Sequence, residues 1–122
     1  MPCAPTLHLA PRTSSPSPVT FEEFQRAALR TTNPDLAPDE RLLDAAAGLA
    51  EEAGEVLGLV RKRIFQRRDA GSERFVEELG DVLWCLAVTA DALGVSLGEV
   101  AEANRRKLEQ RHPKGFQVGE TR

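Results

Sequence analysis

Residues 49–56 read LAEEAGEV and residues 75–84 read FVEELGDVLW. Each stretch contains a pair of acids spaced by three residues, Glu52 with Glu55 and Glu78 with Asp81. Side chains at that spacing lie side by side on one face of a helix. Glu52 and Glu78 also fall within apolar stripes, because an apolar residue precedes each by three positions and another follows it by four. Burying unpaired carboxylates is costly. The pattern therefore predicts a neutralising group, and a hard divalent cation with oxygen ligands is the simplest.

The composition indicates one soluble helical domain. The chain has 122 residues, a length sufficient for one domain with a single core. Of these residues 41% are hydrophobic and 29% charged, which is typical of a soluble globular protein. Aromatic residues are few and Tyr is absent, which favours helix over sheet. The net charge of -3 argues against a nucleic-acid partner. Neither a signal segment nor a membrane span is evident, so a cytoplasmic location is expected by default.

Proline, glycine and capping residues divide the chain into segments. Residues 1–19 hold five of the eight prolines, which predicts a disordered Pro/Ser-rich arm, while residues 20–116 form the predicted domain and residues 117–122 a flexible tail. Helices are expected at about 20–30, 39–66 and 72–93, and between Ser96 and Pro113, with Thr20, Ser72 and Ser96 as N-caps and Gly94 in the left-handed position. The short connections predict an all-α four-helix bundle, completed by dimerisation.

Two further features bear on how the helices meet. Gly54 and Gly80 lie between the paired acids, where a plausible reason for glycine is close approach of helices that brings the acid pairs together. The two cysteines, Cys3 and Cys85, suggest neither a disulfide framework nor a zinc site, and Cys85 is expected in the core.

The acids and the basic residues together suggest a metal–polyphosphate site. Four carboxylates exceed what one Mg²⁺ needs, and Mg²⁺ commonly takes substrate phosphates as ligands. Asn104, Lys107 and Arg111 share one face of the last helix, and Lys107 and Arg111 suit phosphate oxygens. Lys62 is the first candidate in the basic run 61–68. The alternative is a basic helix end favoured by the helix dipole, with the acids facing solvent or paired with Arg and Lys.

Other kinds of site find less support in the sequence. Glu109 and His112 form one E-x-x-H, whereas di-iron bundles need two. No P-loop glycine motif is present, and no His occupies a helical core position for Ser-His-Asp or Cys-His catalysis.

The acidic motifs resemble those of the MazG-like family of all-α nucleoside triphosphate pyrophosphohydrolases. The likeness lies in Glu51-Glu52-x-x-Glu55 and Glu78-x-x-Asp81, and it extends to other parts of the chain. These are Phe24-Gln25 with Arg30-Thr31 in the first helix, residues 49–55 and 77–84, and the C-terminal Asn104, Lys107-Leu108, Arg111 and Pro113-x-Gly115-Phe116. The resemblance covers about residues 20–116.

The resemblance implies Mg²⁺-dependent cleavage of a nucleoside triphosphate to the monophosphate and pyrophosphate, with Mn²⁺ as a substitute. By resemblance the metal ligands are Glu52, Glu55, Glu78 and Asp81, Glu51 binds a second ion or orients water, and Asn104, Lys107 and Arg111 contact the phosphates. A homodimer or homotetramer, with the site near a subunit interface, is also implied. Removal of unwanted nucleotides from the pool is an inference from the resemblance alone.

The base pocket and the rival functions rest on fewer residues. Gln25 could read a base edge, and Phe21, Phe24 or Trp84 could line the pocket or simply belong to the core. The rivals are hydrolysis of another pyrophosphate-containing nucleotide, and a non-catalytic nucleotide-binding or interaction bundle. Only an enzyme would turn over, whereas any metal-binding version would be stabilised by Mg²⁺.

Overall fold

A computed structural model describes residues 18–119 and contains four helices. They are α1 (Phe21–Leu29), α2 (Pro38–Phe65), α3 (Gly71–Ala92) and α4 (Leu97–Arg111). No strand occurs within the described range, so the predicted all-α fold is confirmed. The predicted arm, except for its last two residues, and the last three residues of the predicted tail lie outside the described residues.

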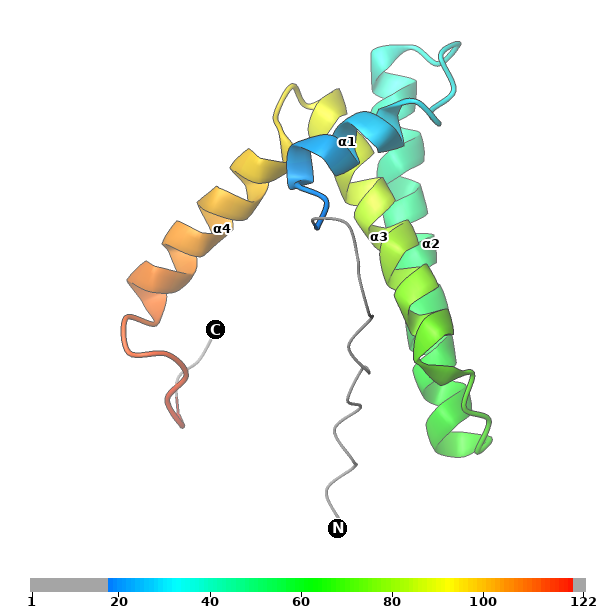
Figure 1. The fold of residues 1–122 in the computed structure, drawn as a ribbon, viewed down its shortest axis with the longest axis vertical. Coiled ribbons are helices and arrows are strands. Elements are labelled where there is room, and N and C mark those ends of the chain that lie inside the picture. The colour runs from blue at the N-terminus through cyan, green and yellow to red at the C-terminus, as the bar shows by residue number, and fades with distance from the viewer. Residues whose placement is uncertain (1–17, 120–122) are drawn as a thin grey trace.

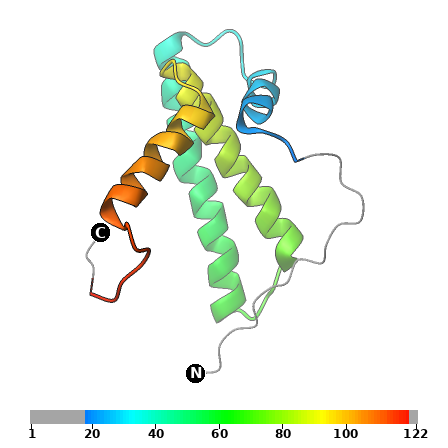
Figure 2. The ribbon, with the colours of Figure 1, turned by 60° about the vertical axis from the view of Figure 1, so that its left-hand side comes forward.

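The helices form a long hairpin with two shorter helices at one end. α2 and α3 run side by side, and α1 lies across the end of this hairpin where α3 finishes (Figure 1). α4 leaves α3 at a bend of 99° and diverges from the hairpin, as the turned view in Figure 2 also shows. α1 contacts both α3 and α4, so it braces this bend from one side.

Local capping explains most of the helix boundaries. The Thr20 side chain accepts a hydrogen bond from the Glu23 amide, and Ser96 with Glu99 forms a complete capping box. Gly94 has φ of +77°, which confirms the predicted left-handed turn between α3 and α4. The predicted Ser72 cap is wrong. α3 begins one residue earlier, at Gly71, whose amide donates to Asp69 Oδ1 at 2.9 Å.

The core is small and gathers around α3, where it contacts α1, α2 and α4. Its buried members are Ala28, Ala45, Ala87, Val88 and Leu97, with Phe24, Leu83 and Trp84 packed against them. The short Ala side chains let α1 and α2 approach α3 closely there. The remaining length of the hairpin has few fully buried side chains, so the tightly packed part of the fold is its α1–α4 end.

The closest helix approach differs from the prediction. A Cβ added to Gly48 would lie 3.2 Å from Cys85 Sγ, which marks the tight α2–α3 contact and confirms Cys85 as a core residue. A Cβ on Gly54 or Gly80 would meet no atom within 4 Å. Within one chain, the prediction that these two glycines allow a close helix contact is therefore wrong, because both face outward.

Large apolar side chains remain exposed along the hairpin. On α2 they include Leu43, Leu57 and Ile64, and on α3 Leu79 and Leu86, followed by Leu93 at its C-cap. Within each set the spacing is a multiple of seven residues, so each set follows one helix face. No single helix between residues 18 and 119 is long and apolar enough to cross a membrane, and α3 with α4 passes that test only as a bent pair.

Candidate metal centre

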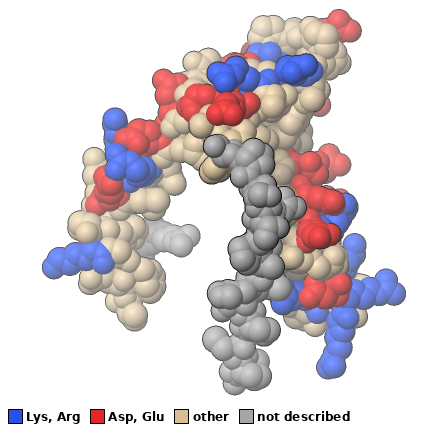
Figure 3. Space-filling view, in the orientation of Figure 1, with Lys and Arg blue, Asp and Glu red and all other residues tan. Residues whose placement is uncertain are grey.

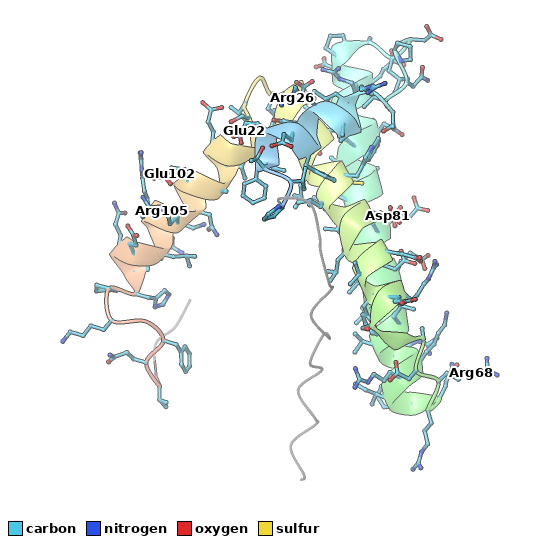
Figure 4. The ribbon with its side chains drawn as sticks, viewed as in Figure 1. Glu22, Arg26, Arg68, Asp81, Glu102 and Arg105 are labelled. Carbon is cyan, nitrogen blue, oxygen red and sulfur yellow. The ribbon has the colours of Figure 1, made fainter. Side chains whose placement is uncertain are left out.

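Three carboxylates from two helices converge midway along the hairpin. Glu52 on α2 and Glu78 and Asp81 on α3 each offer an oxygen, and these oxygens lie within 4.8 Å of one another. Glu78 is buried, Glu52 half-buried and Asp81 exposed, so the group runs from the α2–α3 interface to solvent. Figure 4 shows Asp81 projecting from the hairpin. The two more buried members, Glu52 and Glu78, are the acids that lie within the apolar stripes.

Arg74, which is not among the residues predicted from the sequence motifs, contacts the buried Glu78. Arg74 Nη2 lies 2.6 Å from Glu78 Oε1, one helical turn along α3. Its Nη1 donates to Glu77 Oε2 at 3.1 Å, on the exposed side of the helix. The hydrogen bond to Glu77 and the charge of Glu78 raise the pKa of Arg74. The i, i+4 spacing of Arg74 and Glu78 is visible in the sequence and could have identified this pair.

The electrostatics of the cluster favour a cation. Desolvation raises the pKa of Glu52 above its usual value, and the negative charges of Asp81 and Glu78 raise it further. Desolvation, followed by the charges of Glu52 and Asp81, also raises the pKa of the Cys85 thiol. A positive charge among the three oxygens would relieve this repulsion, and Arg74 already supplies one beside Glu78.

The donor set fits a hard divalent cation. Carboxylate oxygens from Glu52, Glu78 and Asp81 are the ligands that Mg²⁺ and Mn²⁺ prefer, and three of them leave positions for water or phosphate. Glu55 and Glu51 are exposed on α2 and lie outside this group of three. The hairpin thus brings together three of the four predicted ligands.

The predicted phosphate contacts lie elsewhere in the molecule. Asn104, Lys107 and Arg111 are exposed on α4, which contacts α1 and α3 but not α2 among the described residues. From the helical rise and the 99° bend, Lys107 is on the order of 20 Å from Asp81. One chain therefore does not bring α4 to the acids.

Lys62 lies toward the other end of the hairpin. It is exposed and belongs to a basic cluster around the α2–α3 turn, formed by Arg61, Lys62, Arg63, Arg67 and Arg68. Figure 3 shows these basic side chains beyond the acidic ones, and Figure 4 labels Arg68 at the turn. This basic cluster therefore places positive charge on the same hairpin as the carboxylates.

The two residues expected at the base pocket have structural partners. Gln25 is buried, and its Nε2 donates to the carbonyl oxygens of Ala87 at 3.0 Å and Val95 at 3.3 Å. Its Oε1 accepts from the Leu97 amide at 3.0 Å. Both N–H donors are used, so this geometry does not fit base reading by Gln25. Trp84 packs against the core, and its Nε1 donates to Thr31 Oγ1 at 2.7 Å.

One known family matches most of the hairpin and all of α4. The model of the MazG nucleotide pyrophosphohydrolase domain matches residues 41–116. The chain belongs to the MazG family. The match contains all three clustered carboxylates, Arg74 and the basic face of α4, while α1 lies before it. In this MazG protein, α1 therefore lies outside the matched segment. It contributes the Gln25 clamp, which is the set of hydrogen bonds between the Gln25 amide and the backbone groups of Ala87, Val95 and Leu97.

Two relatives share the central part of the chain. The uncharacterized protein YvdC of Bacillus subtilis (strain 168) is 38% identical over 72 residues, covering 52% of this chain and 68% of YvdC. The Gene 37 protein of Mycobacterium phage L5 is 36% identical over 85 residues, covering 66% of this chain and 74% of its own length. No solved structure gives a significant match.

Proposed function

We propose that this MazG protein hydrolyses ribo- or deoxyribonucleoside triphosphates to the monophosphate and pyrophosphate, with Mg²⁺ as cofactor. The observation that carries the proposal is the convergence of the Glu52, Glu78 and Asp81 oxygens within 4.8 Å. Membership of a nucleotide pyrophosphohydrolase family supports the reaction class. A cytoplasmic role in removing unwanted nucleotides is consistent with this activity.

The chain's residues would divide the chemistry between them. Glu52, Glu78 and Asp81 would hold the cation, and Glu55, one turn along α2 from Glu52, would be the fourth ligand. When bound, Mg²⁺ polarises phosphoryl oxygens and lowers the pKa of water. Water attacks phosphorus, the anhydride bond between the α- and β-phosphates breaks, and pyrophosphate leaves. Glu51 is exposed beside Glu52 and would accept the proton of the water.

A second copy of the chain would complete the site. The exposed apolar faces of α2 and α3 favour a partner with a matching face, and a second copy presents the same residues. α4 leads away from its own acids, so Asn104, Lys107 and Arg111 would contact the phosphates bound by another copy. Lys107 and Arg111 would then stabilise the negative charge that develops on the pyrophosphate leaving group.

Product analysis with purified protein tests the proposal. The protein is incubated with Mg²⁺ or Mn²⁺ and a panel of ribo- and deoxyribonucleoside triphosphates, and products are separated by ion-exchange chromatography. Asp81→Asn is the informative variant, since Asp81 is exposed and its loss leaves the core intact. Glu73→Gln is its matched control, an exposed acid on the same helix outside the cluster.

The expected result is monophosphate plus pyrophosphate, abolished by EDTA and reduced at least about 100-fold in Asp81→Asn. Glu73→Gln should retain the activity. Release of a monophosphate from a nucleotide sugar instead would move the substrate to another pyrophosphate. Metal binding without turnover of any substrate would favour a non-catalytic nucleotide-binding bundle.

A further inference from the structure

Glu78 is the one buried acid in the part of the chain that the structure describes. Its side chain is 5% exposed, while the side chain of its partner Arg74 is 53% exposed. No other cation lies within ion-pair distance of Glu78 among residues 18–119. The buried charge is therefore balanced by a group that stands largely in solvent.

We propose that Arg74 is an internal counter-cation that occupies Glu78 when no metal is bound and has to leave Glu78 for the metal to bind. The inference rests on the proposed function, because it takes the three carboxylates as the metal site. It assigns Arg74 a regulatory role at that site. The chemical class of the competing ligand is a divalent cation with oxygen coordination.

Arg74 and a divalent cation would compete for Glu78 because both are positively charged and both would lie close to its carboxylate. The guanidinium lies 2.6 Å from one Glu78 oxygen, and that carboxylate shares a 4.8 Å cluster with Glu52 and Asp81. A divalent ion bound by the cluster would lie within a few ångströms of the guanidinium, where like charges repel. Even if the ion used the other Glu78 oxygen, the metal ion and the guanidinium would each weaken the binding of the other to Glu78.

Arg74 has a second ionic partner besides Glu78. Glu77 accepts from its second terminal nitrogen at 3.1 Å, on the exposed side of α3. The guanidinium can therefore leave Glu78 while keeping an ionic partner, and the exposed part of its side chain gains hydration. Moving the Arg74 guanidinium from Glu78 to Glu77 therefore costs little free energy when a metal ion takes its place. Without either cation, the charge of the buried Glu78 would be unpaired.

The test is metal binding and stability of the full chain, without substrate. Wild type, Arg74→Gln, Arg74→Lys and Arg105→Gln are stripped with EDTA and titrated with MgCl₂ by calorimetry, with fluorescence of the one tryptophan, Trp84, as second readout. Arg105→Gln is the matched control, since Arg105 pairs with Glu102 and Glu109 at helical spacing on α4, away from the acids.

Arg74→Gln should bind Mg²⁺ about tenfold more tightly than wild type and melt at a lower temperature in EDTA. Arg74→Lys should bind more weakly than Arg74→Gln, and Arg105→Gln should bind as wild type does. A residue that only holds the site in shape would lose affinity on removal, so the direction of the change distinguishes the two roles.

Unchanged or weaker Mg²⁺ binding in Arg74→Gln, with wild type binding normally, would overturn this inference and leave the proposed function standing. Absence of Mg²⁺ binding in wild type would overturn the proposed metal site itself. Thermal melts in EDTA and in saturating Mg²⁺ show whether each variant is folded.

Discussion

Two buried polar residues, Gln25 and Glu78, are 7% and 4% exposed as whole residues, yet their surroundings differ in kind. Gln25 is neutral, and its amide is held by three backbone groups at the α1–α4 end. Glu78 is charged, and its partner is a largely exposed arginine. A polar group bound by rigid backbone stabilises one structure. A buried charge with a movable partner, beside two more carboxylates, is instead available to a ligand.

Removal of the Gln25 clamp should produce the largest change in stability. Gln25→Leu leaves the Ala87 and Val95 carbonyl oxygens and the Leu97 amide without this partner, which should lower the free energy of unfolding by about 3 kcal/mol. Urea denaturation measures the change. Mg²⁺ affinity of the folded variant should stay the same. A variant of unchanged stability but altered base preference would restore Gln25 to the base pocket.

Glu52→Gln should act in the opposite direction. The folded-state pKa of Glu52 lies above its ordinary value of 4.5, so the ionised group destabilises the metal-free fold at neutral pH. The variant should therefore melt higher than wild type in EDTA and lose the stabilisation by Mg²⁺. The gain should shrink as the pH falls through the raised pKa and vanish below 4.5, as thermal melts across that range would show.

Gly54→Ala separates a solvent-facing hairpin from one covered by a second copy. A Cβ there meets nothing within the chain, so an isolated chain should gain about 1 kcal/mol of helix stability. With a second copy packed on this face, the methyl group should instead weaken assembly. We expect weaker assembly, measured as mass by light scattering over a dilution series. A more stable variant of unchanged mass would argue against a partner at Gly54.

The smallest effect should come from the ion pairs of α4. The hydrogen bond from Arg105 lowers the pKa of Glu102 to about 2, with Arg106 also contributing. Both side chains of the Arg105 pair are substantially exposed, so Glu102→Gln should lower Tm by only about 2 °C at neutral pH. The difference from wild type should fade as the pH drops from 4.5 toward 2. A difference that persists at pH 2 would contradict the electrostatic origin.

Much of the fold was predictable because its signals are local. Thr20, Pro38, Gly94 and Ser96 mark helix boundaries through backbone geometry and capping that involve only neighbouring residues. The Ser72 cap was wrong because α3 begins at Gly71, with Ala70 as its N-cap and with the Gly71 amide donating to Asp69. The roles of Gly48 and Gly54 were not predictable, since helix glycines look alike until the packing partner of each helix face is known.

The sequence by itself determined the all-α class, the helical pairing of the acids and the apolar stripes that contain Glu52 and Glu78. These follow from a 3.6-residue period that any reader of the chain can apply. Only the tertiary structure decided that Glu52 joins Glu78 and Asp81, that Gln25 clamps the α1–α4 end, and that α4 leads away from the acids. Those outcomes depend on which helix faces meet and at what angle, which is set by side-chain packing between residues far apart in the chain.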